Sequence, residues 1–377
     1  MRDSVSVVMF EGSDPRSRVE EMITAVRQAS LLDNLEKMKM VPEIGSIYLY
    51  TNRAELVRDA ENAGARVELN STAPAGFHFG RALQKAVREN NLTRVFCLNG
   101  AGCPLISPSE LSMICRTLLT RENFVYTNNT QSADIAAFTV TDGFAGLELP
   151  AMDNSLALTL RDELGLEMEL MPHSLGLLFD IDTPSDLLVL GSGPFCGMKT
   201  RAALDCLNLD YTRLEQAKQV LGNEYRDVAL VGRVGAPVIA RLNAILKLRL
   251  RIFSEERGMK SLGRIASREV VSLLGMLIEH SGLEKFFSYL EKVAECAFID
   301  SRVLMYHFGC YLSDQERYLS DLGLWQEIEN PWLQEFTRLA SECGIPVILG
   351  GHSLVSGSLW ALTCELNPDE RESWRSC

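Results

Sequence analysis

The alternation of short apolar runs with segments of helical spacing is the feature that most constrains the fold of this chain. Each run is long enough for a buried strand, and the residues after it have apolar positions that recur every three or four residues. Strands that alternate with helices favour a largely parallel sheet covered by helices on both faces. In the first half, strands are predicted at 5–10, 44–52, 65–70 and 94–100. The sequence therefore predicts an α/β fold whose ligands bind at the carboxyl ends of the strands.

The same alternation returns in the second half of the chain. A strand and turn are predicted at 227–235, a strand at 247–258, helices at 236–245 and 267–296, and a strand, glycine loop and helix at 345–362. Residues 123–190 are less regular, with strands predicted at 124–128, 134–140 and 167–182. We therefore expect a first domain over 1–190, a helical linker over 191–225 and a second α/β domain over 226–377.

Composition and charge limit the classes of function. A chain of 377 residues with 46% apolar content can bury ample core, and its length suggests two domains. The net charge of −13 argues against nucleic-acid binding, although a nucleotide needs only a few local donors. Glu11 and Asp14 interrupt the N-terminal apolar run, and the longest uncharged run contains Pro346 and several glycines. We therefore expect neither a signal peptide nor a membrane span. The ten cysteines form no Cys-x-x-Cys pair, so we expect reduced thiols in a cytoplasmic protein without a zinc site.

Four motifs of the first half together resemble a known family. They are GSDPRSR at 12–18, GFHFGRALQKAV at 76–87, VFCLNGAGCPLIS at 95–107 and FDIDTPSDL at 179–187. Their order resembles the GT-A-fold nucleotidyltransferases of cofactor biosynthesis, the group of molybdopterin guanylyltransferase and 2-phospho-lactate guanylyltransferase. The resemblance covers roughly residues 1–190. It implies a GT-A-like (Rossmann-like), mostly parallel sheet domain that transfers a nucleotidyl group from a nucleoside triphosphate with the help of Mg²⁺.

The first motif offers groups that could surround a triphosphate. Such a site needs backbone amides or basic side chains around the phosphates. The resemblance places the amides of Gly12 and Ser13 there, with Arg16 and Arg18 as phosphate clamps. The alternative interpretation of the same residues is a polar loop before the solvated start of a helix.

The second motif places two glycines at the start of a helix. Free amides and the positive helix end at Gly76 and Gly80 would suit an anion or a base edge. The alternative is a glycine turn before an ordinary helix. His78 lies between two phenylalanines, which favours a packed residue over an acid–base catalyst.

The last two motifs concern the metal. Asp180 and Asp182 are two residues apart, so in a strand both carboxylates would face one ion. Gly102 falls where the family carries a metal-binding aspartate, and a glycine side chain cannot bind Mg²⁺. Asn99 offers only a neutral oxygen as a substitute.

The motif at 179–187 also has a purely structural interpretation. Thr183, Pro184 and Asp186 have the spacing of a helix N-cap, a proline at the first helical position and a carboxylate at the third. That arrangement is needed whether or not a metal binds.

The second half has candidates of its own at predicted strand ends. Arg233 follows one strand, and Asp300 and Arg302 follow another. Gly351, His352 and Ser353 follow a third strand, and a glycine-rich strand end before a helix is typical of anion binding. If these strands are neighbours, the residues form one charged pocket. Taken singly, each is explained as well by polar groups that satisfy loop backbone.

These observations favour nucleotidyl transfer to a phosphorylated or cofactor-precursor acceptor, whose own phosphate oxygen would be the nucleophile. Gly102 favours the main alternative, a non-catalytic protein that binds a nucleotide or other ligand. A third class is glycosyl transfer from a nucleotide sugar, for which Asp180 and Asp182 have the form of an acidic D-x-D pair. The expected partners are a nucleotide and a small acceptor, without nucleic acid or membrane, and a homo-oligomer is compatible with the sequence.

Overall fold

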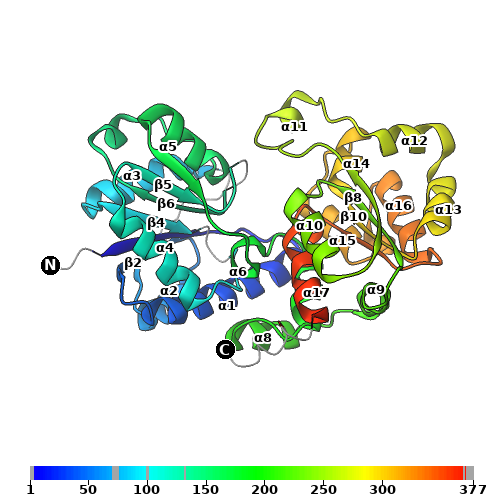
Figure 1. Cartoon of the computed structure of the whole chain (residues 1–377), viewed down its shortest axis with the longest axis horizontal. Coiled ribbons are helices and arrows are strands. Elements are labelled where there is room, and N and C mark those ends of the chain that lie inside the picture. The colour runs from blue at the N-terminus through cyan, green and yellow to red at the C-terminus, as the bar shows by residue number, and fades with distance from the viewer. Residues whose placement is uncertain (1–3, 70–75, 99–101, 131–132, 368–369, 371–377) are drawn as a thin grey trace. The chain divides into compact units, whose positions relative to one another are not determined.

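The computed structural model describes residues 4–69, 76–98, 102–130, 133–367 and 370. Its contacts divide the chain into two compact units, each with its own sheet (Figure 1). The first unit comprises Met1–Pro15, Arg27–Leu178 and Gly197–Thr200. The second unit comprises Arg16–Val26, Phe179–Cys196 and Arg201–Cys377. The chain therefore passes between the units five times, after residues 15, 26, 178, 196 and 200.

The first unit is built on a seven-stranded sheet with the order β3-β2-β1-β4-β6-β5-β7. Its strands are β1 (Val5–Glu11), β2 (Ile44–Thr51), β3 (Arg66–Leu69), β4 (Arg94–Leu98), β5 (Phe124–Thr127), β6 (Ile135–Thr139) and β7 (Glu167–Leu170). All neighbours run parallel except β6, which is antiparallel to both β4 and β5. The strand order changes direction between β1 and β4, which makes their carboxyl ends the topological switch point of this unit.

Helices cover both faces of this sheet, as the alternating sequence predicts. They are α1 (Arg18–Lys39), α2 (Ala54–Asn62), α3 (Phe79–Glu89), α4 (Pro108–Thr120), α5 (Leu156–Leu164) and α6 (Leu175–Leu178). Apolar residues of α1, α2 and α4 pack in one core cluster, and those of α3 and α5 pack in another on the opposite face. Helix α1 contributes to both units, because Val19 belongs to the second unit's core and Leu31 to the first unit's core.

The second unit has a four-stranded sheet in which all neighbours are parallel, in the order β11-β10-β8-β9. Its strands are β8 (Asp227–Gly232), β9 (Arg249–Ser254), β10 (Cys296–Asp300) and β11 (Val347–Gly350). Its helices are α7 (Pro184–Ser192), α9 (Thr212–Leu221), α10 (Ala236–Ile245), α11 (Arg264–Ser267), α12 (Leu273–Ser281), α13 (Leu283–Val293), α14 (Ser301–His307), α15 (Asp314–Asp321), α16 (Pro331–Glu342) and α17 (Leu359–Leu366), and α8 (Met198–Asp205) bridges residues assigned to both units. The predicted α/β fold is confirmed, with a mostly parallel sheet followed by a second parallel sheet.

Two predicted elements are wrong. The strand expected over 167–182 ends at Leu170, and the apolar residues after it form helix α6 and an extended, unpaired segment. The single helix expected over 267–296 is two helices, α12 and α13, which meet at Gly282. Gly282 has a φ of +83°, a conformation that interrupts a right-handed helix and that glycine adopts without a steric cost.

Two other sequence-based expectations concern cysteines and membrane spans. The nine cysteines in the described part of the chain are free thiols, most of them buried, for example Cys97 and Cys115. Burial raises the pKa of the Cys115 thiol to about 12, which keeps it protonated and unreactive. Within the described ranges, no helix combines the length and apolarity that a membrane crossing requires.

Candidate functional site

The turn after β1 is held in place by the side chain of Asn52, the residue that follows β2. The Ser13 amide donates to Asn52 Oδ1 at 3.1 Å, and Asn52 Nδ2 donates back to the Ser13 carbonyl at 3.1 Å. Gly12 is exposed beside it, and a Cβ there would lie 3.4 Å from Asn52 Oδ1. The Ser13 amide assigned to phosphate binding is therefore engaged by the protein, and Gly12 and Ser13 form a pre-ordered turn at the switch point.

A buried carboxylate lies directly before this turn. Glu11, the last residue of β1, is only 3% exposed. Arg27 of α1 pairs with it, with Nη2 3.1 Å from Oε2 and Nε 3.4 Å from Oε1. Because a buried charge needs a partner, Arg27 lets an acidic residue sit at the ligand-binding edge without a metal ion.

Polar side chains of α1 also fix the loop after β4. Asn34, which is fully buried, donates from Nδ2 to the Cys103 carbonyl at 3.0 Å. Lys37 donates from Nζ to the Pro104 carbonyl at 2.7 Å and to Asn34 Oδ1 at 3.1 Å. Gly102 is buried directly before these two residues, whereas the predicted ligand Asn99 lies outside the described residues.

The start of α3 is packed against another segment of the first unit. The amides of Phe79 and Gly80 donate to the carbonyls of Ala151 and Pro150, each at 3.0 Å. A Cβ on Gly80 would lie 2.7 Å from the Pro150 carbonyl oxygen. The prediction for Gly80 relied on a free amide, and that amide is engaged. Position 80 requires a glycine because α3 packs closely against the Pro150 carbonyl.

Two further residues of this motif lie beside that contact. Gly76 is exposed just before the helix. His78 is the N-cap, and its side chain accepts a hydrogen bond from the Arg81 amide at 3.3 Å.

The two predicted phosphate clamps group with the second unit. Arg16 donates from its backbone amide to Glu20 Oε2 at 2.7 Å. The Arg18 guanidinium lies 3.7 Å from the Glu327 carboxylate, and both side chains are largely exposed. The contacts described for Arg18 are therefore with the second unit, and an exposed pair at this distance contributes little to stability.

The segment 179–187, which the resemblance assigned to the first domain, also packs in the second unit. Asp186 is fully buried at the third position of α7 and accepts hydrogen bonds from the amide and hydroxyl of Thr183 at 2.8 and 3.0 Å. It also accepts from the hydroxyls of Ser353 and Ser358 at 2.7 and 2.6 Å. Ser185 donates to the Leu349 carbonyl at 2.5 Å. The predicted capping arrangement is confirmed, and it also ties α7 to the loop after β11.

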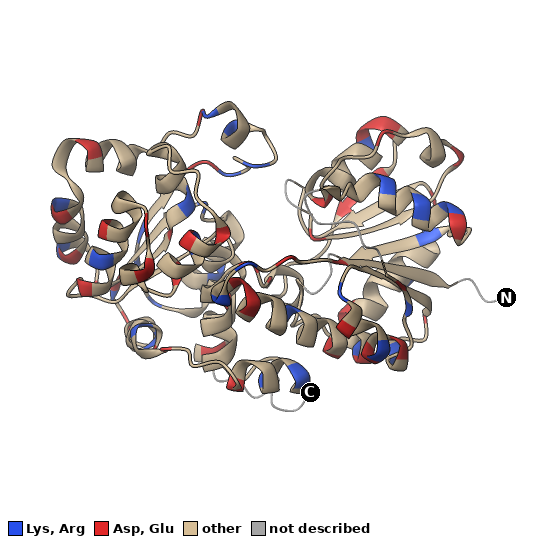
Figure 2. Ribbon diagram, turned by 180° about the vertical axis from the view of Figure 1, so that it is seen from behind, with Lys and Arg blue, Asp and Glu red and all other residues tan. Residues whose placement is uncertain are grey.

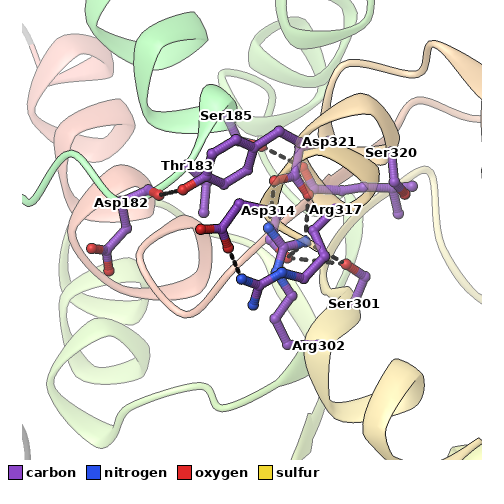
Figure 3. A network of polar contacts seen from close by, with 12 residues as sticks. Asp182, Thr183, Ser185, Ser301, Arg302, Asp314, Arg317, Ser320 and Asp321 are labelled. Atoms are coloured by element: carbon purple, nitrogen blue, oxygen red, sulfur yellow. Dashed lines mark hydrogen bonds and ion pairs between the residues drawn. The ribbon is translucent and has the colours of Figure 1, made fainter. Parts of the chain in front are cut away.

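The two predicted metal ligands precede that cap. Asp180 and Asp182 lie in an extended segment without strand pairing, so the strand geometry assumed for them is wrong. Asp182 is exposed, its carbonyl accepts from the Tyr318 hydroxyl at 3.3 Å, and its carboxylate points away from the neighbouring network (Figure 3). In the described ranges, no group of three or more His, Cys, Asp or Glu side chains is arranged to hold a metal ion. The metal role of Asp180 and Asp182 therefore stays a prediction.

The candidates of the second half are brought together at one sheet edge. Asp300, at the end of β10, is fully buried and pairs with Arg233, with Nε 2.5 Å from Oδ2 and Nη2 3.0 Å from Oδ1. Burial works to raise the pKa of Asp300, but the positive charge of Arg233 and its hydrogen bonds, together with the charge of Arg302, outweigh burial and hold that pKa below its ordinary value. Gly232 has a φ of +105°, and a Cβ there would lie 2.5 Å from the Asp300 Cβ. Only glycine therefore fits this close approach of β8 and β10.

Arg302 serves a different partner. Both terminal nitrogens of its guanidinium donate to Asp321, with Nη1 and Nη2 each 2.6 Å from a carboxylate oxygen, and Nη1 also donates to the Ser301 hydroxyl at 3.0 Å (Figure 3). Both residues are 5% exposed. This buried bidentate pair engages both terminal nitrogens of Arg302 and holds α14 against α15.

The three residues after β11 have separate surroundings. Gly351 packs against Thr183, where a Cβ would lie 2.9 Å from the threonine methyl group. Ser353 is buried, and its hydroxyl donates a hydrogen bond to Asp186. His352 is partly exposed, and burial with the charges of Arg233 and Arg257 lowers its pKa to about 4, so its imidazole is neutral at pH 7.

Sequence reasoning missed several of these partners. Asn52 directly follows a predicted strand, so a polar residue at a strand end could have drawn attention to it. Arg27, Asp321 and Arg257 lie inside ordinary polar faces or loops, and nothing local marks them. Their roles depend on contacts with residues distant in the sequence.

Comparison with known proteins gives similarity to solved structures alone, because no family model and no curated protein matches this chain. A cytidylyltransferase from Leptospira borgpetersenii serovar Hardjo-bovis is 17% identical, with a TM-score of 0.39, over 57% of this chain and 93% of that chain. A nucleotidyl transfer enzyme from Methanothermobacter thermautotroptrophicus is 14% identical, with a TM-score of 0.36, over 47% and 91%. The 4-diphosphocytidyl-2C-methyl-D-erythritol synthase from Anaerococcus prevotii is 11% identical, with a TM-score of 0.36, over 54% and 96%. These are distant similarities that span about half of this chain.

Proposed function

We propose that the first unit binds a nucleoside triphosphate at the carboxyl ends of β1 and β4 and transfers its nucleotidyl group to a small acceptor. The observation that carries this proposal is the pre-ordered backbone at the switch point. Asn52 holds the turn at Gly12 and Ser13, and Asn34 with Lys37 holds the carbonyls of Cys103 and Pro104 next to Gly102. Ligands of open α/β sheets bind at such a point. Backbone that is already ordered loses no further conformational entropy when the ligand binds.

The chemistry follows from the class of reaction. An acceptor oxygen attacks the α-phosphorus, the bond from that phosphorus to the β-phosphate bridge breaks, and pyrophosphate leaves with the bonding electrons. We propose a phosphorylated or cofactor-precursor acceptor, because an ionised phosphate oxygen needs no general base. The chain would align the two reactants, which is a large part of catalysis in phosphoryl-type transfers.

The residues of the first unit fit a resident Mg²⁺ poorly. Gly102 has no carboxylate, Glu11 is neutralised by Arg27, and both Asp180 and Asp182 group with the second unit. We therefore propose that Mg²⁺ enters as the complex with the triphosphate, as part of the substrate. Mg²⁺ commonly binds through substrate phosphates and retained waters with few protein ligands.

Binding is tested by thermal shift of the full chain with GTP, CTP, ATP and UDP-sugars, with Mg²⁺ and with EDTA. We expect one Mg²⁺–nucleotide complex at a hundred times its Kd to stabilise the chain by about 2.7 kcal/mol. The Asn52→Ala variant should lose most of that shift, because the turn at Ser13 loses both hydrogen bonds. The side chain of the exposed Asn62 makes no hydrogen bond with the described residues, so Asn62→Ala is the matched control. If no nucleotide shifts the wild-type melting temperature, the proposal is wrong.

Gly102 specifically favours a second candidate function, a nucleotide-binding protein without turnover. The two are separated by measuring release of pyrophosphate and of label from α-³²P-nucleotides in the presence of phosphorylated acceptors. Nucleotide binding without label transfer to any acceptor would support the second candidate. Stabilisation by a UDP-sugar alone would favour glycosyl transfer.

A further inference from the structure

The second unit has a topological switch point of its own, separate from the nucleotide site proposed above. From β8 the chain first adds β9 on one side and then β10 and β11 on the other. The carboxyl ends of β8 and β10 therefore lie next to each other where the strand order reverses. In open α/β sheets, that is the place where ligands bind.

One side of this edge is positively charged. Arg233 uses Nε and Nη2 on Asp300, and its Nη1 has no partner among the described residues. Arg257 lies directly over Gly235, whose added Cβ would be 2.6 Å from Nη1. Its one hydrogen bond is a long one, 3.4 Å to the Val234 carbonyl, and no carboxylate in the described ranges pairs with it. An arginine without an acidic partner is available to an anion.

The backbone beside these guanidiniums adds to the same charge. Helix α10 starts at Ala236 with Gly235 as its N-cap, and no side chain caps it. Among the described residues, the amides of Gly235 and Ala236 have no hydrogen-bond acceptor. Free amides at the start of a ten-residue helix favour a negative charge there. Figure 2 shows both basic and acidic positions along the segment that carries α11, where Arg264 is paired with Glu256, so the positive charge available to a ligand there is that of Arg257.

The other side of the edge can accept and donate hydrogen bonds without a positive charge. His352 makes no hydrogen bond with the described residues, and it lies close enough to Arg233, Asp300, Arg257 and Asp182 for their charges to act on it. Asp182 presents an exposed carboxylate. A neutral imidazole offers one donor and one acceptor, and a carboxylate accepts from hydroxyl groups. Together they suit a ligand that carries hydroxyls.

We propose that the second unit binds a small phosphorylated molecule with free hydroxyl groups, of the sugar-phosphate class, at the carboxyl ends of β8, β10 and β11. The phosphate would contact Arg257, Nη1 of Arg233 and the first amides of α10. The hydroxyls would contact His352 and Asp182. This binding does not depend on the nucleotide site of the first unit.

The ligand charge follows from the same residues. Asp300 neutralises Arg233, Arg257 keeps one positive charge without an acidic partner among the described residues, and Asp182 adds an exposed negative charge, so the side chains carry too little positive charge for a triphosphate. This edge can therefore accommodate one phosphate group, held by the two arginines and the first amides of α10. A ligand with hydroxyls but no phosphate would leave Arg257 and the helix amides without a partner.

The proposal is tested by isothermal titration calorimetry of the full chain with ribose 5-phosphate, inorganic phosphate and unphosphorylated ribose. We expect ribose 5-phosphate to bind, inorganic phosphate to bind at least tenfold more weakly, and ribose not to bind. Arg257→Gln should weaken ribose 5-phosphate binding at least tenfold. The control is Lys260→Gln, which removes the same charge from an exposed side chain of the same segment and should leave the Kd unchanged.

His352→Gln separates the two halves of the site. It should weaken ribose 5-phosphate binding several-fold and leave inorganic phosphate binding unchanged, since only the sugar reaches the imidazole. Each variant is checked for an unchanged melting temperature without ligand, and Arg257 is exposed, so its replacement should fold normally.

The same proteins distinguish this proposal from the nucleotide proposal. Arg257→Gln should keep the nucleotide-induced thermal shift, and Asn52→Ala should keep ribose 5-phosphate binding. Absence of ribose 5-phosphate binding to the wild type would overturn the proposal. So would binding that Asn52→Ala abolishes and Arg257→Gln does not, because the phosphate would then occupy the first unit.

Discussion

Asp186 shows how one buried side chain can join segments far apart in the chain. It accepts hydrogen bonds from Thr183 at the start of α7 and from Ser353 and Ser358 beyond β11. Burial and the nearby charge of Asp182 raise its pKa to about 6, although the serine hydroxyls oppose that shift. His352, one residue before Ser353, is shifted in the opposite sense, to about 4. The two groups therefore titrate in the same pH range with opposite effects on stability.

The pH dependence of unfolding should show these opposite signs. The raised pKa of Asp186 contributes stability that is full below about pH 4 and is lost as pH rises through about 6. The lowered pKa of His352 contributes stability that is full above about pH 6.5 and is lost as pH falls through about 4. Each contribution changes by about 2 kcal/mol between pH 4.5 and 6.5.

Denaturant unfolding of wild type, His352→Gln and Asp186→Asn at pH 4.5, 5.5 and 6.5 measures both contributions. The free energy of unfolding of wild type minus that of His352→Gln should increase with pH. Wild type minus Asp186→Asn should decrease with pH. If both free-energy differences changed with pH in the same direction, these pKa directions would be contradicted.

At this scale the sequence predicts local partners and misses distant ones. The spacing of Thr183, Pro184 and Asp186 predicts the helix cap, because all three lie within one helical turn. The serines that complete the site of Asp186 follow it by 167 and 172 residues, and no local rule relates them. Asp300 and Arg233 were both proposed for one pocket, yet their pairing required the adjacency of β8 and β10.

At the scale of elements, Gly80 sets how closely α3 approaches the segment at 149–151. Its amide donates to the Pro150 carbonyl, and a Cβ would lie 2.7 Å from that oxygen and would also collide with Leu149. The glycine is therefore needed for contact rather than for an unusual backbone conformation.

Gly80→Ala should destabilise the first unit by on the order of 2 kcal/mol, because overpacking outweighs the better helix propensity of alanine. Gly146 has open space around its Cβ position, so Gly146→Ala is the matched control and should change the free energy of unfolding by less than about 0.5 kcal/mol. Denaturant melts followed by circular dichroism measure both. Equal melts for the two variants would show that α3 can shift away from Leu149.

Elements with a clear period were predicted well, and short apolar runs were not. Residues 227–232 and 236–245 form the strand and helix that their patterns indicate. The run at 171–181 has the pattern of a strand end, but periodicity alone cannot separate a short apolar strand from a helical turn. The chain leaves the sheet after Leu170 and forms α6 instead.

The two units are interleaved along the chain. Residues 16–26 and 179–196 precede most of the second unit in sequence and yet group with it. Val19 is 2% exposed in the core cluster of α13 and α16, and Asp186 is buried against the loop after β11. Boundaries placed by composition assume that a domain is one continuous segment, so this division could not be expected from the sequence.

Cutting the chain between residues 190 and 191 should therefore damage the second unit more than the first. The fragment 191–377 lacks all of α7 except its last two residues, and it also lacks the start of α1, which leaves apolar core uncovered. Expressed alone, it should elute as aggregate or melt without cooperativity. Co-expressed with the fragment 1–190, it should form a soluble complex, because the missing segments complete its core. Size-exclusion chromatography and thermal melts followed by circular dichroism measure both states.

Val19→Asp in the fragment 1–190 should abolish that complex, since an unpaired charge would enter the core of the second unit. The neighbouring Arg18 is exposed, and its pair with Glu327 is long, so Arg18→Ala should leave the complex intact. A fragment 191–377 that melts cooperatively alone, at the temperature of the full chain, would mean that residues 16–26 and 179–190 add no stability to it. Residues 191–377 would then fold independently, although contacts group residues 16–26 and 179–190 with them.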